Sequence, residues 1–296
     1  MTYDAPLPAD LQQWVRDRMP GRARVTDVSW PRGDSMVWRL VTDRDEIYVK
    51  ISPTPEDYAR EVRGYAHAAC ALSPGEAPRL LAKAPGLRAL MSSSQPGRVV
   101  RGLLLNTAEE LLLYNLAGEL LRRWHEHPVP ASPHERAAIQ ESVAGQAREA
   151  ATCLESITSA HLSTAERDLV RRVRDELPHL AKELPVVYRH GDYATRNWMW
   201  DASRGHGVID FQKSAHGLAI EEFVWLFGAV WATRPDLEAA YFSGYGRPLT
   251  DTERQALLLF TTRLGVSYLH TGIAKRRTLL IDRGHLVLER MVRACS

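Results

Sequence analysis

Cysteine is scarce in this chain of 296 residues, and long hydrophobic runs are missing. The three cysteines, Cys70, Cys153 and Cys295, lie far apart and form no Cys-x-x-Cys pair, which argues against a disulfide scaffold or a cysteine metal cluster. The longest apolar stretch, around residues 223–232, is much shorter than the roughly 20 residues that cross a bilayer. Residues 1–6 lack the basic and apolar regions of a secretory signal. We therefore expect a cytoplasmic protein with no membrane partner.

An excess of charge of one sign is also missing. The chain has 38 Lys and Arg against 36 Asp and Glu, a net charge of +2 at pH 7, which is too weak to predict a nucleic-acid partner. Two enzyme signatures are absent as well. The Gly-x4-Gly-Lys-Ser/Thr loop does not occur, which excludes a P-loop kinase, and the lack of a Gly-x-Ser-x-Gly elbow argues against a serine hydrolase.

The most informative segment is Tyr-Arg-His-Gly-Asp-Tyr-Ala-Thr-Arg-Asn at residues 188–197. Asp192 is followed five residues later by Asn197, and Asp210 comes thirteen residues after Asn197. A phosphoryl-transfer site needs one carboxylate to take the proton of the acceptor hydroxyl, and an amide and a second carboxylate to hold Mg²⁺ on the nucleotide. This spacing of Asp, Asn and Asp therefore indicates a kinase-type reaction.

The residues between Asn197 and Asp210 predict a hairpin. Residues 198–200 form a short apolar run, residues 201–207 are rich in turn formers, and residues 208–209 resume a β-branched strand. Asn197 and Asp210 should thus lie at adjacent ends of one hairpin and face the same cavity.

This motif resembles the catalytic loop of the aminoglycoside phosphotransferase family, which carries His-Gly-Asp where protein kinases carry His-Arg-Asp. The resemblance in pattern extends from about Val25 to about Trp231. It implies an α+β, bilobal protein-kinase-like fold. A strand-rich nucleotide-binding lobe would span residues 1–91, a hinge 92–97, and a helical lobe with the catalytic loop and acceptor site 98–296.

The same resemblance implies roles for individual residues. Asp192 would be the catalytic base, Asn197 and Asp210 the Mg²⁺ ligands, and His190 an organiser of the loop. Upstream, the alternating segment 46–51 is typical of a strand and would carry the nucleotide lysine, Lys50. Glu61, in a segment with helical spacing after two prolines, is the expected partner of Lys50.

Two further nucleotide contacts are implied by the resemblance. The turn around Gly33 would cover the phosphates, with Ser35 in the place of a serine that the family often has there. After a strand over residues 87–91, the adenine ring would bind the carbonyl of Ser92 and the N–H of Ser94, with Met91 behind it. The substrate nucleotide would be ATP or GTP.

Much of the remaining chain has helical periodicity. We expect helices over residues 107–125, 135–158 and 164–184, the last opening with a capping box at Ser163 and Glu166. The family usually has a further Asp downstream of its metal-binding Asp, and this chain has Glu221 or Glu222 instead. Gln212 is a second departure, because it stands where many relatives have Asp-x-x-Asp or Asp-Phe-Gly.

The acceptor is the least specific part of the prediction. Within the resembling family an antibiotic is favoured, either an aminoglycoside or a basic peptide of the capreomycin and viomycin type; macrolides fit less well. A cationic acceptor needs carboxylates, and the candidates are Asp192, Glu221, Glu222, Asp236 and Glu238. A metabolic kinase for choline, homoserine or a sugar remains an alternative, and a pseudokinase acting as a binding module is a weaker one. Either a monomer or a dimer is compatible with the sequence.

Overall fold

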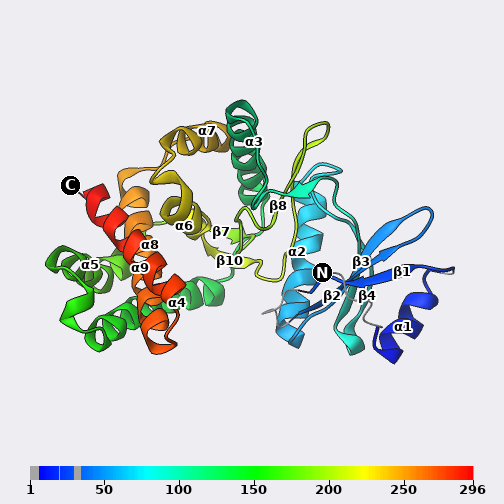
Figure 1. The fold of residues 1–296 in the computed structure, drawn as a ribbon, viewed down its shortest axis with the longest axis horizontal. Helices are drawn as coiled ribbons and strands as arrows, with labels where there is room; N and C mark the ends of the chain where they lie inside the picture. Colours follow the sequence, from blue (N-terminus) through cyan, green and yellow to red (C-terminus); the bar gives the residue numbers. More distant parts are fainter. Residues whose placement is uncertain (1–6, 20, 30–34, 296) are drawn as a thin grey trace. The chain divides into compact units, whose positions relative to one another are not determined.

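The computed structural model describes residues 7–19, 21–29 and 35–295 (Figure 1). Its internal contacts divide the chain into two compact units. We call them the strand unit, Met1–Leu104 with His190–Ala215, and the helical unit, Leu105–Arg189 with His216–Ser296. The catalytic-loop segment thus groups with the amino-terminal strands, whereas the predicted lobes place it with the helices; the lobe boundaries stay a prediction. Residues 1–6 and Gly33 lie outside the described residues.

Two antiparallel sheets form the framework of the strand unit. The larger has five strands in the order β1-β2-β3-β5-β4, and the smaller has three in the order β6-β8-β9. The larger sheet contains β1 (Arg24–Asp27), β2 (Met36–Val41), β3 (Glu46–Ile51), β4 (Leu80–Ala84) and β5 (Ala89–Ser93), with a 3-10 turn at Pro85–Leu87; the smaller contains β6 (Arg98–Val99), β8 (Trp198–Asp201) and β9 (Gly205–Val208). The predicted strand over residues 46–51 and the predicted hairpin are both confirmed.

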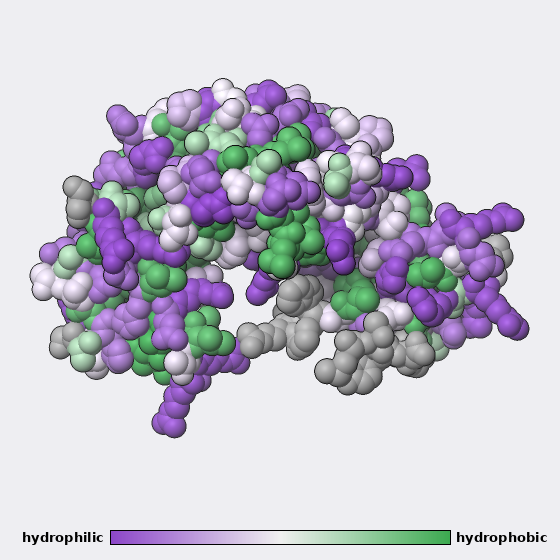
Figure 2. Space-filling view, turned by 45° about the horizontal axis from the view of Figure 1, so that its top comes forward, coloured by the Kyte–Doolittle hydropathy of each residue, from purple (hydrophilic) through white to green (hydrophobic). Residues whose placement is uncertain are grey.

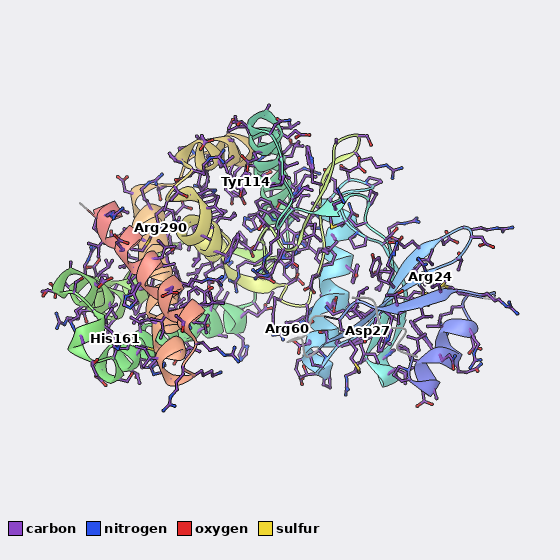
Figure 3. All side chains as sticks on the ribbon, viewed as in Figure 1. Arg24, Asp27, Arg60, Tyr114, His161 and Arg290 are labelled. Carbon is purple, nitrogen blue, oxygen red and sulfur yellow. The ribbon has the colours of Figure 1, made fainter. Side chains whose placement is uncertain are left out.

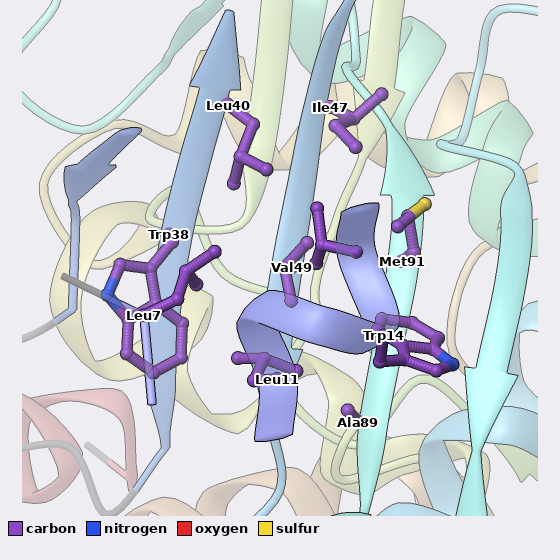
Figure 4. Close-up of a cluster of buried hydrophobic side chains, with 10 residues drawn as sticks. Leu7, Leu11, Trp14, Trp38, Leu40, Ile47, Val49, Ala89 and Met91 are labelled. Carbon is purple, nitrogen blue, oxygen red and sulfur yellow. The ribbon is translucent and has the colours of Figure 1, made fainter. Parts of the chain in front are cut away.

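A short amphipathic helix, α1 (Ala9–Arg16), packs on the larger sheet and closes its hydrophobic core (Figure 4). Leu11 of α1 is 1% exposed, and Val49 at the centre of β3 is completely buried. Trp14 and Trp38 add large aromatic surfaces to the same cluster. This core holds β3 rigidly, and β3 carries Lys50.

The helix α2 (Pro55–Ala71) follows β3 and is longer than its sequence pattern indicated. Thr54 caps its first turn, since the Thr54 hydroxyl accepts from the N–H of Asp57 at 3.0 Å, and Pro55 occupies a first-turn position where its missing N–H costs nothing. Gly64 allows α2 to approach closely, because a Cβ there would lie 2.4 Å from that of Phe211. The helix is thereby held against the segment that carries Asp210.

The helical unit consists mainly of six helices longer than one turn among its described residues. These are α3 (Thr107–Glu126), α4 (Pro133–Ser156), α5 (Thr164–Leu180), α7 (Pro235–Tyr245), α8 (Asp251–Ala274) and α9 (Thr278–Cys295). The chain between them contains β7 (Val186–Arg189), which pairs with β10 (Ala215–Leu218), 3-10 turns at Ser159–His161 and Ala219–Phe223, and the one-turn helix α6 (Val224–Leu226). The predicted capping box of Ser163 and Glu166 is present, and α5 ends four residues before Leu184.

One helical segment departs from α-geometry. Residues Phe227–Trp231 form a turn of π-helix, and Arg290 of α9 (Figure 3) donates from Nη1 to the carbonyl of Gly228 at 2.8 Å. The guanidinium thus satisfies a carbonyl where the helix widens.

Hydrophilic residues make up much of the face drawn in Figure 2. Among the described residues, no helix combines the length and the apolar composition needed to span a membrane.

Candidate active site

Asp192 lies in a tight loop of the strand unit with its carboxylate held by two neighbours. Arg196 donates to both oxygens, from Nη2 to Oδ1 and from Nε to Oδ2, the latter at 3.1 Å. The side-chain amide of Asn197 donates to Oδ2 at 2.8 Å and to the main-chain carbonyl of Asp192 at 2.9 Å. About 24% of the Asp192 side chain is exposed. The carboxylate is therefore oriented precisely and still accessible to a ligand.

The two residues before Asp192 explain why the loop has this form. Gly191 has a φ of +84°, and a Cβ there would lie 2.1 Å from the carbonyl oxygen of Lys213, so a side chain is excluded. His190 is fully buried and accepts at Nδ1 from the N–H of Asp192 at 3.2 Å. Its Nε2 then carries the proton and donates to the carbonyl of Ile209 at 3.1 Å. Burial lowers the pKa of His190, which keeps the ring neutral in this bridging role.

The hairpin of β8 and β9 brings the two predicted metal ligands to one end. Trp198 lies opposite Val208 in the ladder, and the N–H of Ile209 donates to the carbonyl of Asn197 at 2.9 Å, which extends the pairing by one step. Asp210 follows with a φ of +70°, in the left-handed region that aspartate tolerates better than most residues. The turn at Asp210 redirects the chain away from the ladder.

Lys50 connects β3, α2 and the hairpin through two ion pairs. Its ammonium lies 2.9 Å from Glu61 Oε1 and 2.8 Å from Asp210 Oδ1. Ser52 adds a 3.4 Å hydrogen bond to Oε2 of Glu61. The expected partnership of Lys50 with Glu61 is thus present, and Asp210 joins it. Residues separated by 160 positions in the sequence converge on one ammonium group.

The charge states follow from this arrangement. Burial alone would lower the pKa of Lys50, but Asp210 and Glu61 outweigh it and raise the pKa above its ordinary value. Desolvation by the surrounding protein would raise the pKa of Asp210, yet Lys50 brings it below the usual range. Burial raises the pKa of Glu61 to about 6, although Lys50 opposes this change. At neutral pH all three groups are charged.

The pKa of Glu61 predicts a pH dependence of stability. Because the folded-state value is about 6, above the ordinary 4.5, the stability that protonated Glu61 contributes is complete below pH 4.5 and is lost as the pH rises through 6. As the pH rises from 4.5 to 6.5, the unsubstituted protein should lose about 2 kcal/mol of its free energy of unfolding at this site, whereas Glu61→Gln, which cannot ionise there, should not. The difference between the two proteins should therefore grow by about 2 kcal/mol in favour of the variant, measured by urea titration. Glu46→Gln should show no such gain, because Arg39 lowers the pKa of Glu46. Parallel profiles for the Glu61→Gln variant and the unsubstituted chain would contradict this assignment.

The donor chemistry of Asn197 and Asp210 fits a magnesium ion. The amide nitrogen of Asn197 is used by Asp192, so its amide oxygen is the atom that remains for a cation. Asp210 supplies a carboxylate, 42% exposed as a side chain. Hard oxygen ligands of this kind suit Mg²⁺, which usually takes only one or two protein groups together with phosphate oxygens and water. The assignment of both residues as metal ligands stays a prediction.

Ser35 lies beside the same segment. Its hydroxyl donates to the side-chain oxygen of Gln212 at 2.7 Å, two residues after Asp210. The sequence pattern treated Gln212 as a departure from the family and assigned it no role. The long-range contact shows that this glutamine connects the end of the predicted phosphate loop to the segment that carries the predicted metal ligand Asp210. Gly33, the other expected residue of this loop, lies outside the described residues.

The predicted nucleobase contacts lie on β5 and on the residue that follows it. Met91 is 3% exposed and pairs with Val49, and Ser92 lies opposite Tyr48. The N–H of Ser94 already donates to the carbonyl of Glu46 at 3.1 Å. Antiparallel ladders repeat their bonded pairs every second residue, so the carbonyl of Ser92 points to Tyr48 in the same way. The Ser94 N–H is thus already used within the strand unit, whereas the Ser92 carbonyl keeps a second lone pair, and the contacts of Met91, Ser92 and Ser94 with a nucleobase stay a prediction.

The predicted acceptor carboxylates other than Asp192 belong to the helical unit, and arginines pair with three of them. Glu221 lies 3.0 Å from Arg189 and also accepts from the N–H of Leu218 at 3.1 Å. Glu222 is 5% exposed. The remaining pairs are Asp236 with Arg234 at 2.7 Å and Glu238 with Arg254 at 3.3 Å. Their part in acceptor binding stays a prediction, and a cationic acceptor would have to compete with these arginines.

Sequence reasoning assigned no role to Arg196, although it lies inside the quoted motif. A cation four residues after the predicted catalytic Asp and directly before the predicted metal-binding Asn was the available signal. Only the folded loop shows that its guanidinium forms a fork on Asp192.

The phosphotransferase class defined by this fold and motif agrees with comparisons to known proteins. The model of the phosphotransferase enzyme family, APH, matches residues 27–258. The chain belongs to this family. No curated protein sequence matches it.

Solved structures show the same fold at low sequence identity. The GDP complex of wild-type aminoglycoside 2'-phosphotransferase-IIIa superposes with a TM-score of 0.66 at 15% identity, covering 97% of this chain and 99% of that one. The gentamicin complex of APH(2")-IIa gives 0.67 at 14% identity, with 97% and 99% covered. Spectinomycin phosphotransferase APH(9)-Ia with ADP and spectinomycin gives 0.61 at 12% identity, with 97% and 98% covered. The predicted α+β, protein-kinase-like fold class is confirmed.

Proposed function

We propose that this protein transfers the terminal phosphoryl group of ATP or GTP to a hydroxyl of a small cationic antibiotic, an aminoglycoside or a tuberactinomycin-type peptide, and thereby inactivates it. The observation that carries the proposal is the convergence of Lys50, Glu61 and Asp210 in ion pairs on the unit that also carries the oriented Asp192 and Asn197. A pseudokinase is disfavoured because none of the four residues expected of an active kinase is missing: the chain has Lys50, Asp192, Asn197 and Asp210. The three free thiols support a cytoplasmic setting.

The chemistry assigns one task to each group. The acceptor oxygen forms a bond to the γ-phosphorus, the bond from that phosphorus to the β–γ bridging oxygen breaks, and the nucleoside diphosphate leaves. Asp192 receives the proton of the acceptor hydroxyl. Lys50 neutralises phosphate charge, and Glu61 holds its ammonium in place. Each role uses a side chain that is fixed by at least one hydrogen bond within the strand unit.

Asn197 and Asp210 would hold a magnesium ion in this site. When bound, the ion would neutralise phosphate charge and align the phosphate oxygens. The chain's own contribution is the geometry of the two ligands at one end of the hairpin, with Lys50 beside Asp210.

The class of acceptor is inferred from the structural relatives and from the charged residues of the helical unit. The structural relatives named above include complexes with gentamicin and with spectinomycin, which supports an antibiotic acceptor for this chain by analogy of fold. The acidic residues expected to bind a cationic acceptor are Glu221, Asp236 and Glu238, and each already has an arginine partner. A metabolic kinase whose acceptor is choline, homoserine or a sugar is the second candidate, and this pairing favours the sugar among them because a sugar carries no positive charge.

A panel of acceptors separates the two candidates. Aminoglycosides, tuberactinomycin-type peptides, a macrolide, choline, homoserine and simple sugars would each be incubated with ATP and with GTP. Product mass should rise by one phosphate group for at least one basic antibiotic, with matching release of nucleoside diphosphate. If only choline, homoserine or a sugar gains phosphate, the metabolic candidate replaces the antibiotic one. If none gains phosphate while nucleotide binds, both acceptor classes fall.

Salt dependence is a second measure of the acceptor. Ion pairs that a polycation forms on an accessible surface are screened over about 8–10 Å at ordinary ionic strength, so the acceptor KM should increase several-fold between low and moderate salt. A neutral acceptor under the same nucleotide saturation is the control, since nucleotide phosphates are themselves charged.

Charge reversal at Glu221, Glu222, Asp236 and Glu238, one at a time, should raise the acceptor KM at some of these positions with kcat less affected. An acceptor KM that is independent of salt would argue against electrostatic acceptor binding.

A further inference from the structure

The guanidinium of Arg196 has more binding capacity than Asp192 uses. A guanidinium carries five N–H donors in a fixed plane. The contacts to Asp192 come from Nε and Nη2, and no other partner of this side chain is present among the described residues. About 33% of the Arg196 side chain is exposed. One edge of the guanidinium is thus occupied, and the Nη1 side remains able to bind a ligand.

The position of Arg196 follows from the reaction at Asp192. A general base lies roughly 2.6–3.2 Å from the hydroxyl oxygen that it deprotonates. That oxygen lies about 3–3.5 Å from the phosphorus it attacks. The transferring phosphoryl group is therefore within about 7 Å of the Asp192 carboxylate when the reaction begins. A cation in direct contact with this carboxylate is within side-chain reach of the phosphoryl oxygens.

Lys50 does not supply this charge at Asp192. Its ammonium lies between Glu61 and Asp210, at 2.9 and 2.8 Å, on the side of the predicted metal ligands. Arg196 contacts Asp192 instead. Among the described residues, Lys50 and Arg196 thus pair with two different carboxylates of the site, Asp210 and Asp192. A guanidinium group binds two oxygens of a phosphate in the same bidentate manner in which it binds the two oxygens of a carboxylate.

We propose that Arg196 bridges the catalytic base and the transferring phosphoryl group, with Nε and Nη2 on Asp192 and the Nη1 side on the γ-phosphoryl oxygens. This inference rests on the proposed phosphotransferase function and adds a residue to it. The bridge orients the base towards the reacting phosphorus. It also stabilises the negative charge on the γ-phosphoryl oxygens. A nucleoside diphosphate has no γ-phosphoryl group and would not make this contact. Arg196 should therefore discriminate a triphosphate from a diphosphate.

Equilibrium binding tests the bridge without relying on turnover. The probes are the Mg²⁺ complexes of ADP and of adenosine 5′-(β,γ-imido)triphosphate, or the guanosine equivalents, titrated into the intact protein by calorimetry. Arg196→Gln should weaken triphosphate binding by about 10-fold or more, the effect of losing a charge-assisted hydrogen bond, and leave the diphosphate Kd within about 2-fold. Arg196→Lys should recover part of the loss because it keeps the charge without the planar fork.

The matched control is Arg204→Gln, in the exposed turn between β8 and β9 of the same unit. It should change neither Kd. Asp192→Ala provides a second check: it removes the carboxylate partner and leaves the guanidinium, so the preference for triphosphate over diphosphate should persist. In steady-state assays, Arg196→Gln should reduce kcat with little change in acceptor KM.

The outcomes separate this inference from the function on which it rests. Equal weakening of triphosphate and diphosphate binding by Arg196→Gln would assign Arg196 a purely structural role in the loop and overturn the bridge. An unchanged preference for triphosphate would overturn it as well. In both cases the unsubstituted protein would still bind nucleotide and transfer phosphate. If the unsubstituted protein binds no nucleotide, the proposed function fails and the bridge fails with it.

Discussion

Replacing Asp192 by alanine is expected to reduce kcat for phosphoryl transfer by roughly 10²–10⁴-fold, the usual cost of removing a general base. The affinity for the Mg²⁺ complex of the nucleoside diphosphate should remain close to that of the unsubstituted protein. The reason is that Asp192 contacts Arg196 and Asn197 but neither Lys50 nor Glu61, which belong to a separate ion-pair set. Single-turnover kinetics and calorimetric titration measure the two quantities independently.

A control is needed because Asp192 also supports its loop. Asn197 donates to the main-chain carbonyl of residue 192 as well as to the carboxylate, so the loop retains one of these bonds in the alanine variant. An unchanged thermal midpoint would show that the fold is intact. Turnover near that of the unsubstituted protein would rule out Asp192 as the base.

Asp210→Asn is expected to lower affinity for the Mg²⁺-nucleotide by about 10²-fold and kcat by roughly 10²–10³-fold, the range observed when one electrostatic stabiliser is removed. A carboxylate holds a hard dication more strongly than an amide does. Asparagine is preferred to alanine here because the backbone of Asp210 has a φ of +70°, which asparagine also tolerates. The loss of affinity therefore reports charge and not backbone strain.

Asn197→Ala is the companion variant and should weaken Mg²⁺-nucleotide binding less than Asp210→Asn does. Titrating each protein with nucleotide in the presence and absence of Mg²⁺ isolates the metal-dependent part of the affinity. Equal affinity of Asp210→Asn and the unsubstituted chain for Mg²⁺-nucleotide would remove Asp210 from the metal site. A similar loss of nucleotide affinity with and without Mg²⁺ would indicate that Lys50 had moved after losing its partner Asp210.

The local pattern of the sequence was sufficient for several elements, including those that carry Lys50, Asn197 and Asp210. The alternation in residues 46–51, the turn formers in residues 201–207 and the capping box at Ser163 each predict structure through interactions between near neighbours, and all three are present. The pairing of Lys50 with Glu61 was predicted from the resemblance to the aminoglycoside phosphotransferase family, and the two residues lie on a strand and the helix that follows it. Such short-range relations depend little on the rest of the chain.

Contacts between distant residues were beyond the sequence pattern. The convergence of Lys50 with Asp210 and of Ser35 with Gln212 depends on how β2 and β3 pack near the segment after β9. The Ser94 contact to Glu46 follows from the register of β5 on β3, and one-dimensional periodicity does not specify a register between strands. For the same reason the arginines that pair with Glu221 and Glu238 could not be foreseen.

The chemistry of the reaction therefore follows from residue types at short spacing: an Asp, an Asn and an Asp whose positions along one loop and hairpin already imply a base and two oxygen ligands. The charge partner of each predicted catalytic group was decided in three dimensions. Arg196 lies on Asp192 because the loop turns sharply at Gly191, where a side chain would meet the carbonyl of Lys213. A motif specifies which atoms are available, and only packing specifies which of them come within hydrogen-bond distance.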